Sequence, residues 1–563
     1  MNNSRYQPDF RPDEWSDEDR RLLYPFVTNL DGLVTVLRNM PPEMVGALCS
    51  RASRANGYLL RVLLDEYLYP VLRGENKAEA AELEAVIDFY HKHGVTSALN
   101  SDRARKFYAR NHAGYGDESV AQMTGTHFVL WGVSQVAMKL LEDSRIGAAP
   151  QEKSTRMVDF TKKVQGKYLY YTDPDIVQAR LGDEYKLVND RLFARNAEMV
   201  DLLKDRFAKK FPDVPKSVIE KKAFDTARGF LPMSTLGQVA FDVNGQAAEY
   251  MINKYRKHGL GEMRWITEAL ERELDCEIPS LLYRLKETDP GRLQKLEDYQ
   301  MYLATRISRI EPLARELFDK YQLPWRGRPT STVKLVDNDV YGEVNIIAGI
   351  LFPASEQSLQ NLIVAVRSMT PEERCRILLK YVEGRTERWQ KVGRAFENAF
   401  VTYEILVNGG AYRDIHRHRL LTQERQYFTT QLGYDVPVEI AELRLAELVH
   451  QAMEWMETLW QKVANELDRE HAQYCSTLFH RVRFYQKENL REAFWEIELR
   501  TKPDGHPDYR KIEQEKYRLL KEAYPGIAKF MLADLNEYDF ARRGMEERAA
   551  GKIERLEKLL GKK

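Results

Sequence analysis

The feature of this chain that most constrains its fold is a set of short motifs that occurs twice, in the same order, in its two halves. QEKSTR (151–156) in the first half has a partner in QERQYF (423–428) in the second. Further on, MSTLGQVAFDVNGQAAEY (233–250) and CSTLFHRVRFYQKENLREAFWE (475–496) share a Ser-Thr-Leu and an Asn. Because the motifs keep their order, they indicate a diverged tandem duplication, in which one structural unit is built twice.

A linker-like stretch separates the two halves. YQLPWRGRPTSTVKLVDND (321–339) is rich in proline and arginine, a composition typical of connections between domains. We therefore expect repeat one to cover residues 91–320 and repeat two, which ends in a charged helix, to cover residues 321–563. Residues 1–90 have no partner in the second half and are expected to form a helical extension at the N-terminus.

Most of the sequence has the periodicity of amphipathic helix. Apolar residues recur at three- and four-residue spacing in SLQNLIVAVRSM (358–369) and in AELRLAELVHQAMEWMETLWQKVANELDREH (441–471). Strand-like patterns are short and rarer, and we expect strands at KYLYYT (167–172) and EVNIIAGILF (343–352). The sequence thus predicts a helix-dominated α+β fold.

Composition narrows the class of protein. Lys+Arg and Asp+Glu both number 85, so the overall charge gives no reason to expect a nucleic acid or an anionic membrane as partner. The four cysteines lie far apart and show no metal-binding or disulfide spacing, so we expect no metal site and a cytoplasmic location. No apolar run of about 18 residues occurs, which argues against a membrane-spanning helix. No Rossmann or P-loop glycine motif occurs in its proper context, so a nucleotide cofactor would need another type of site.

The segment YRDIHRHRLLTQERQYF (412–428) concentrates positive charge in a chain whose formal net charge is zero. On a helix, Arg413, His416 and Arg417 would share one face, while Arg419 would point elsewhere. One interpretation is a solvated basic surface. The other is the wall of an anion pocket, because the preceding sequence is largely apolar and buried arginines need anions or carboxylates.

Two further segments offer polar groups in a regular pattern. In NLREAFWEIELR, Asn489, Glu496 and Arg500 fall on one helical stripe, which is either an ordinary Glu–Arg helix pair or a polar pocket wall. In QEKSTRM, Ser154 and Arg156 suit a turn that offers a hydroxyl, backbone N–H groups and a guanidinium to a phosphate.

Taken in order, these motifs give the second half a clear relationship: it resembles the flavin-dependent thymidylate synthases. That family carries a Glu-His-x-x-Phe-Thr-Phe segment, an Arg, an RHR triplet, a Ser-x-Arg-Tyr loop, and an Asn-x-Arg followed nine residues later by Arg. The matching residues of the second half are Glu397, Arg413, the triplet Arg417, His418 and Arg419, and then Asn489, Arg491 and Arg500.

The first half resembles the same family but keeps the complementary motif. It retains Glu152, Ser154 and Arg156 of the Ser-x-Arg loop, whereas residues 144–146 (Ser-Arg-Ile) stand in place of the RHR triplet. The second half shows the reverse loss, since residues 426–428 (Gln-Tyr-Phe) stand where Ser-x-Arg is expected.

The resemblance implies a fold, a reaction and an assembly. Each repeat would hold a small antiparallel sheet packed by helices. The family's enzyme is a homotetramer that methylates deoxyuridylate (dUMP) to dTMP with methylenetetrahydrofolate, using FAD as hydride source and NADPH as electron source. Its sites are shared between subunits. A tandem chain would therefore form a homodimer that acts as a pseudo-tetramer, with hybrid sites built from both repeats.

The resemblance also assigns roles to residues. These are catalytic roles for Arg413 and Arg500, cofactor binding for Arg417, His418, Arg419, Asn489 and Arg491, and binding of a dUMP-like nucleotide for Glu152, Ser154 and Arg156.

Two further positions depart from the family pattern: Asn398 replaces the His after Glu397, and Met157 replaces the Tyr of the Ser-x-Arg-Tyr loop. The alternative is therefore a flavin- or nucleotide-binding relative that has lost or changed the reaction. A third alternative is a helical interaction protein whose arginines serve interfaces.

Overall fold

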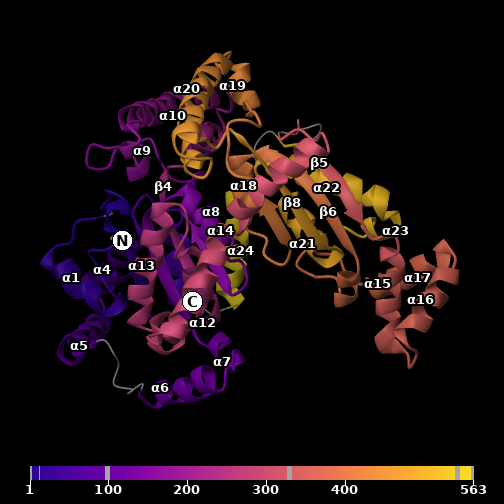
Figure 1. The fold of residues 1–563 in the computed structure, drawn as a ribbon, viewed down its shortest axis with the longest axis horizontal. Coiled ribbons are helices and arrows are strands. Elements are labelled where there is room, and N and C mark those ends of the chain that lie inside the picture. Colours follow the sequence, from indigo (N-terminus) through magenta and orange to yellow (C-terminus); the bar gives the residue numbers. More distant parts are fainter. Residues whose placement is uncertain are drawn as a thin grey trace. The chain divides into compact units, whose positions relative to one another are not determined.

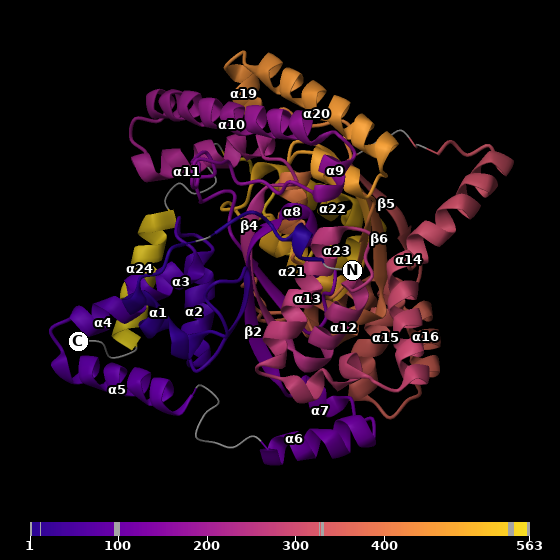
Figure 2. The same ribbon diagram turned by 60° about the vertical axis from the view of Figure 1, so that its left-hand side comes forward.

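The computed structural model describes residues 3–11, 13–94, 102–325, 327, 332–538 and 545–559 (Figures 1 and 2). The chain divides into two compact units, each made of three segments. Unit 1 comprises Met1–Phe207, Glu220–Gly327 and Pro437–Thr477, and unit 2 comprises Ala208–Ile219, Arg328–Val436 and Leu478–Lys563.

Each unit contains one four-stranded antiparallel sheet, and the two sheets share one topology. The sheet of unit 1 consists of β1 (Val34–Leu37), β2 (Gly125–Ser134), β3 (Ala148–Glu152) and β4 (Leu236–Asn244), in the order β1-β2-β4-β3. The sheet of unit 2 consists of β5 (Val333–Asn338), β6 (Phe400–Asn408), β7 (Thr422–Arg425) and β8 (Arg481–Asn489), in the order β5-β6-β8-β7. The repeated strand order confirms the predicted helix-dominated α+β fold with two related repeats.

Equivalent helices follow equivalent strands. Helix α8 (Gln135–Glu142) follows β2 as α18 (Gly409–Ile415) follows β6. Helix α12 (Gly245–Tyr255) follows β4 as α21 (Leu490–Arg500) follows β8, and both are 11 residues long. The two halves therefore match element by element as well as motif by motif.

The same side chain starts the helix after the central strand in both repeats. The Asn244 side chain accepts a hydrogen bond from the backbone N–H of Ala247 at 2.8 Å. Asn489 accepts one from the N–H of Glu492 at 2.9 Å. Asparagine is a favoured N-cap because its carbonyl satisfies an N–H that has no partner inside the helix. The shared Asn of the sequence motif is thus a structural cap in each repeat.

The remaining helices complete the layers around the sheets. In chain order they are α1 (Asp17–Leu23), α2 (Pro42–Ala52), α3 (Leu59–Val62), α4 (Tyr69–Arg73), α5 (Lys77–His93), α6 (Asp102–Tyr108), α7 (Ser119–Gln122), α9 (Pro174–Gln178), α10 (Gly182–Lys210), α11 (Lys216–Ala227), α13 (Gly261–Asp275), α14 (Pro290–Lys320), α15 (Gly342–Leu351), α16 (Leu359–Ser368), α17 (Pro371–Tyr381), α19 (Val438–Glu442), α20 (Ala446–Glu466), α22 (Pro507–Ala523), α23 (Pro525–Ala528) and α24 (Met545–Leu559). None of these described helices combines the length and apolar character needed to cross a membrane.

Helix α20 comes from the second half of the chain but packs in unit 1, beside α10 of the first half (Figures 1 and 2). The Lys462 ammonium lies 2.8 Å from the Glu184 carboxylate. The Arg191 guanidinium lies 5.3 Å from the ring centroid of Trp455. Because α10 and α20 occupy equivalent places before the last strand of their repeats, the long helix of one repeat packs against the long helix of the other.

Three expectations from the sequence are wrong in detail. The segment 343–352 is helix α15 rather than a strand, because a short apolar run has no period that separates a buried strand from a buried helix. The segment 167–172 takes part only in isolated bridges, at Lys167 and Tyr170. Residues 1–90 are not only helical, since β1 pairs with β2 and holds the place that β5 holds in the other sheet.

Candidate functional site

The RHR triplet does not lie on a helix. Helix α18 ends at Ile415, so Arg413 is on its last turn while Arg417 follows in the turn before β7. The predicted shared helix face is therefore wrong: the chain must turn back to place β7 against β8. Arg413 is buried, with 4% of its surface exposed, whereas Arg417 is exposed.

His418, the middle residue of the triplet, points into unit 2. Its Nδ1 lies 3.0 Å from Oε1 of Glu492, and Nε of Arg500 donates to its Nε2 at 3.0 Å. Since a guanidinium can only donate, Nε2 accepts and the ring proton sits on Nδ1, facing Glu492. Two residues of α21 thus fix both the orientation and the tautomer of His418. Arg419, the last residue of the triplet, is exposed.

Behind His418 lies a cluster of charged groups that is fully buried. The ammonium of Lys516 contacts three carboxylates at 2.8–3.3 Å, those of Glu488, Glu496 and Glu513. Burial opposes ionisation of Glu496, but Lys516 and His418 outweigh it and lower the pKa of that carboxyl. Burial and the neighbouring Glu496 raise the pKa of Glu488 and of Glu513. One cation therefore holds Glu496 charged while the other two carboxyls favour their protonated forms.

The sheet register shows that this cluster belongs to repeat two alone. In unit 1, Phe128 of β2 pairs with Phe241 of β4, and the rings stack at 5.1 Å between centroids. The same register in unit 2 pairs Tyr403 with Gln486, which are both fully buried.

Positions occupied by two of the buried carboxylates are likewise apolar in repeat one. Counted from the capping asparagines, Val243 stands at the place of Glu488 and Met251 at the place of Glu496. Burying charge where an apolar core would suffice destabilises a fold, so such groups concentrate at functional sites. We therefore regard this part of unit 2 as the candidate site.

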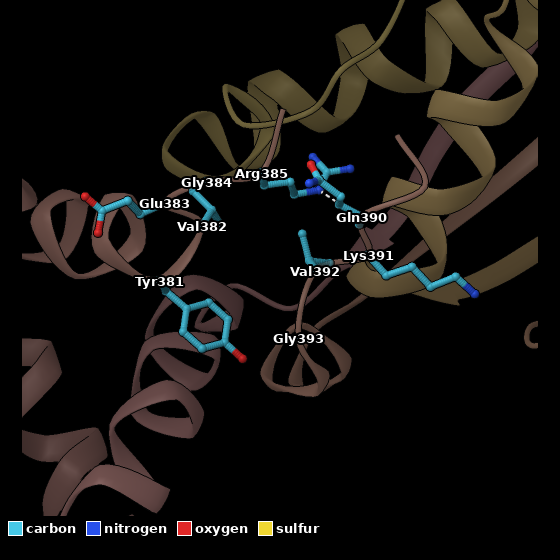
Figure 3. A pocket seen from close by; sticks show the side chains of 9 residues that line it. All are labelled: Tyr381, Val382, Glu383, Gly384, Arg385, Gln390, Lys391, Val392 and Gly393. Carbon is cyan, nitrogen blue, oxygen red and sulfur yellow. Dashed lines mark hydrogen bonds between the residues drawn. The ribbon is translucent and has the colours of Figure 1, made fainter. Parts of the chain in front are cut away.

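Arg491 points away from His418, toward the segment between α17 and β6. Its Nε donates to the carbonyl of Val392 at 3.1 Å, and its Nη1 lies 2.9 Å from Oε1 of Glu397. Val392 lines a cavity of about 360 Å³, together with Arg385 and Gln390, which are themselves joined by a 2.6 Å hydrogen bond (Figure 3). Arg491 therefore supports the wall of this cavity and does not take part in the His418 network.

The candidate residues of repeat one lie at the end of β3. Glu152 is buried, and its Oε1 accepts from Lys139 Nζ at 2.7 Å. In the turn that follows, Ser154 Oγ accepts from the backbone N–H of Arg156 at 3.3 Å. The Arg156 side chain is 11% exposed, and its Nε lies 2.8 Å from Oδ1 of Asp225. Ser154 and Arg156 thus come together in one turn, as the sequence predicts.

A buried cation is common to both repeats. Lys139 lies five residues after Ser134, the N-cap of α8, and Arg413 lies five residues after Asn408, the N-cap of α18. Both side chains are buried. Repeat one therefore has a lysine where repeat two has the arginine singled out from the sequence.

Sequence reasoning missed the groups that hold these residues in place. Glu492, Lys516 and Asp225 carried no motif of their own. A usable signal was present, because Glu488, Glu492 and Glu496 are four residues apart across the end of β8 and the start of α21. A run of carboxylates beside an expected cationic site is a hint that the cations are positioned by them.

The sequence matches a known family in both halves. The profile of the family described as thymidylate synthase complementing protein (Thy1) matches residues 74–280 and 354–526, one match in each repeat.

Several proteins are similar to the chain over nearly its whole length. A UPF0159 protein of Chlamydia muridarum (strain MoPn / Nigg) is 33% identical over 95% of this chain and 98% of its own length. A UPF0159 protein of Chlamydia pneumoniae is 32% identical over 96% of this chain and 98% of its own. UPF0159 protein Ta1429 of Thermoplasma acidophilum is 28% identical over 80% of this chain and 93% of its own.

One solved structure is also similar. It is the UMP/dUMP methylase PolB from Streptomyces cacaoi, bound with 5-Br dUMP, which is 16% identical and has a TM-score of 0.29. The match covers 36% of this chain and 94% of that one.

Proposed function

Since the chain belongs to the thymidylate synthase complementing protein (Thy1) family and carries its fold twice, we propose that it is an FAD-dependent thymidylate synthase. It would methylate dUMP to dTMP in the cytoplasm, with methylenetetrahydrofolate and NADPH as co-substrates. Its sites would be hybrids that draw on both repeats, and two chains would form a homodimer equivalent to the family's tetramer.

The observation that carries this proposal is the division of labour between the repeats. Only repeat two has the network of His418, Glu492 and Arg500, because Ala247 and Tyr255 stand at the places of Glu492 and Arg500 in repeat one. Only repeat one has the Ser154–Arg156 turn. A duplicated chain can lose complementary halves of a site without loss of function if each site uses both copies.

The residues of repeat two fit a flavin dinucleotide by their donor chemistry. Arg417 and Arg419 are exposed guanidiniums on one turn, a suitable partner for a pyrophosphate. His418 between them is held in a fixed tautomer, which suits a planar polar ring. When bound, FAD would supply the hydride for the reaction. Asn489 is occupied as the cap of α21, so its contribution would be to fix the start of that helix.

The Ser154–Arg156 turn supplies what a nucleotide phosphate needs. A hydroxyl and a guanidinium lie on adjacent turn positions, and Asp225 orients the guanidinium. Charge-assisted hydrogen bonds of this kind contribute about 1.5–3 kcal/mol each. Glu152, which is held by Lys139, would fix the end of β3 from which the turn departs.

Arg413 and Arg500 would act on the pyrimidine. A buried guanidinium can stabilise negative charge that develops on a ring as it is activated for attack, because its dipoles need no reorganisation. Arg500 is oriented by its hydrogen bond to His418, and Arg413 is fixed by the burial of its side chain. No protein nucleophile is needed in this account, since the chemistry belongs to the cofactor and the folate.

One observation favours a second candidate function. Asn398, which replaces the family histidine, is exposed, and its side chain donates to the backbone carbonyl of Ala395 at 2.9 Å. An amide cannot exchange protons as an imidazole does. The alternative is therefore a relative that binds flavin and nucleotide but has lost or changed the methylation reaction.

The hybrid site can be tested with one variant in each repeat. Arg156→Ala and Arg417→Ala should each weaken dUMP or FAD binding at least about tenfold, measured by calorimetry and by flavin absorbance, because each removes a charge-assisted contact. Lys162→Ala is a matched control, since Lys162 is an exposed cation on the same loop as Arg156. If Arg156→Ala leaves both affinities unchanged, the hybrid site is wrong.

A further inference from the structure

A second cluster of ionisable groups lies in unit 1, outside the site proposed above. Asp173 and Asp175 stand at the start of α9, and His471 follows α20. One potential ligand atom from each of the three residues lies within 4.8 Å of the other two. The closest printed approach joins His471 Nε2 and Asp175 Oδ2, which are 3.6 Å apart.

His471 is oriented toward this cluster by a fourth residue. Its Nδ1 lies 2.9 Å from Oδ1 of Asp468, and the same oxygen accepts from the His471 backbone N–H at 2.8 Å. Nε2 is buried and has no hydrogen-bond partner within the described ranges. A carboxylate on one ring nitrogen and an open second nitrogen is the arrangement by which proteins orient a metal-ligating histidine.

Asp173 contributes a second open atom. Its side chain is fully buried, and its Oδ1 accepts from the backbone N–H of Asp175 at 2.7 Å as the N-cap of α9. Its Oδ2 is buried and finds no hydrogen-bond donor in the part of the chain that the structure describes. A buried carboxylate oxygen without a donor is costly, so its presence calls for a ligand.

The charges around the cluster leave it negative. Three carboxylates, those of Asp173, Asp175 and Asp468, face His471. On the outer side, Asp175 Oδ1 lies 3.0 Å from Arg5 Nη2, and Tyr6 Oη lies 3.1 Å from both carboxylate oxygens. One arginine cannot balance three carboxylates, so a divalent cation would bring the cluster close to neutrality.

We propose that Asp173, Asp175 and His471 bind a first-row divalent transition-metal ion, with Asp468 as the positioning residue of the histidine. Two carboxylates alone would suit Mg²⁺ or Ca²⁺, but an imidazole nitrogen favours Zn²⁺ and its neighbours. Ligands at about 2.0–2.2 Å from one ion can be about 4.2 Å apart at most, so the cluster needs to close only slightly.

The ion would have a structural role. Asp173 and Asp175 precede the long helix α10 of repeat one, while Asp468 and His471 follow the long helix α20 of repeat two. A bound ion would therefore join the ends of the two paired helices in unit 1. The ligands are almost 300 residues apart in sequence, which explains why no spacing motif announces them, and this site goes beyond the proposed function.

The competing explanation is an ion pair without metal. Burial opposes charging of His471, yet Asp468 and the cluster carboxylates outweigh it and raise the pKa of His471 to about 9. A protonated His471 would then pair with Asp175. The two explanations differ, because a metal must displace the Nε2 proton to bind, whereas an ion pair needs that proton.

The test uses the full chain, stripped with a chelator and then titrated with Zn²⁺ alone. We expect one equivalent to bind per chain, with release of protons, and to raise the Tm, while Mg²⁺ at the same concentration has no effect. Asp173→Asn and His471→Asn should abolish this binding, and Asp468→Asn should weaken it about 10–100-fold. His127→Asn is the matched control, because His127 also lies 3.6 Å from an aspartate, Asp242, but has no second carboxylate in a cluster.

Several results would overturn the proposal. They are the absence of Zn²⁺ binding by the stripped chain, stoichiometric binding that persists in both Asp173→Asn and His471→Asn, and equal loss in His127→Asn. If a variant does not fold, Co²⁺ bound to the unaltered protein still decides. Its visible absorption must show mixed nitrogen and oxygen ligands, and a spectrum of sulfur ligation or of free hydrated Co²⁺ contradicts the site.

Discussion

His418 Nδ1 lies 3.0 Å from Oε1 of Glu492, a contact that ties the turn after α18 to the first turn of α21. Glu492 is the third residue after the capping Asn489, and Ala247 holds the same place after Asn244 in repeat one. The contact is therefore a property of one repeat, which makes Glu492 a direct handle on the candidate site without a change to the shared fold.

Replacement of Glu492 by alanine should reduce the flavin content of the purified protein several-fold while leaving its fold intact. Alanine is a good helix former and occupies this place in repeat one, so α21 should still form, but His418 loses the acceptor that fixes its ring. Absorbance of bound flavin near 450 nm and far-UV circular dichroism measure the two effects. Glu515→Ala, which removes an exposed partner of Arg518, is the control. Equal flavin content in both variants would contradict this role.

The two capping asparagines allow a site effect to be separated from a stability effect. Asn489→Ala and Asn244→Ala each remove one N-cap hydrogen bond of nearly equal length, so each should cost about 1 kcal/mol of stability. Only Asn489→Ala should also lower affinity for FAD, because α21 carries Arg491 and Arg500. Thermal unfolding and flavin titration measure the two quantities. A matching loss of flavin affinity in Asn244→Ala would show that the effect is one of stability alone.

Removal of Lys516 should be among the most damaging single changes in unit 2. Its ammonium is the cation at 2.8–3.3 Å from three fully buried carboxylates, and breaking a buried ion cluster in this way costs about 3–5 kcal/mol. Chemical unfolding of Lys516→Ala measures the loss. Lys462→Ala removes a half-exposed pair with Glu184 and should cost no more than about 1 kcal/mol. A loss of similar size in both variants would mean that the buried cluster is not ionised as described.

The stability of unit 2 should fall as the pH rises from about 5 to 8. Burial, together with Glu496, raises the pKa of Glu513 to about 8 from an ordinary value of 4.5. The folded state therefore binds a proton that the unfolded state releases across this window, and stability is lost as pH increases. Glu513→Gln cannot ionise and should flatten the decline in Tm between pH 5.5 and 8.5. Glu515→Gln, on the same helix but partly exposed, should leave the decline unchanged; a variant at Glu513 that retains it would contradict the assignment.

Motif order in the sequence was enough to predict the duplication, the α+β class and the turn that holds Ser154 and Arg156. It failed where local pattern is ambiguous: the apolar segment 343–352 is helix α15, and the RHR triplet follows the end of α18 rather than extending it. It could not show the partners of the site residues either. Lys516 meets Glu488 and Glu496 only because α22, β8 and α21 pack together, which no spacing along the chain encodes.

The central claim is that this chain, with motifs divided between its repeats, still methylates dUMP. The most direct measurement is tritium release from dUMP labelled at C5, with purified FAD-containing protein, methylenetetrahydrofolate and NADPH. We predict release that requires both co-substrates and is lost in Arg156→Ala and in Arg417→Ala. A yellow protein that binds dUMP and FAD but releases no tritium would contradict the claim and leave the binding relative as the function.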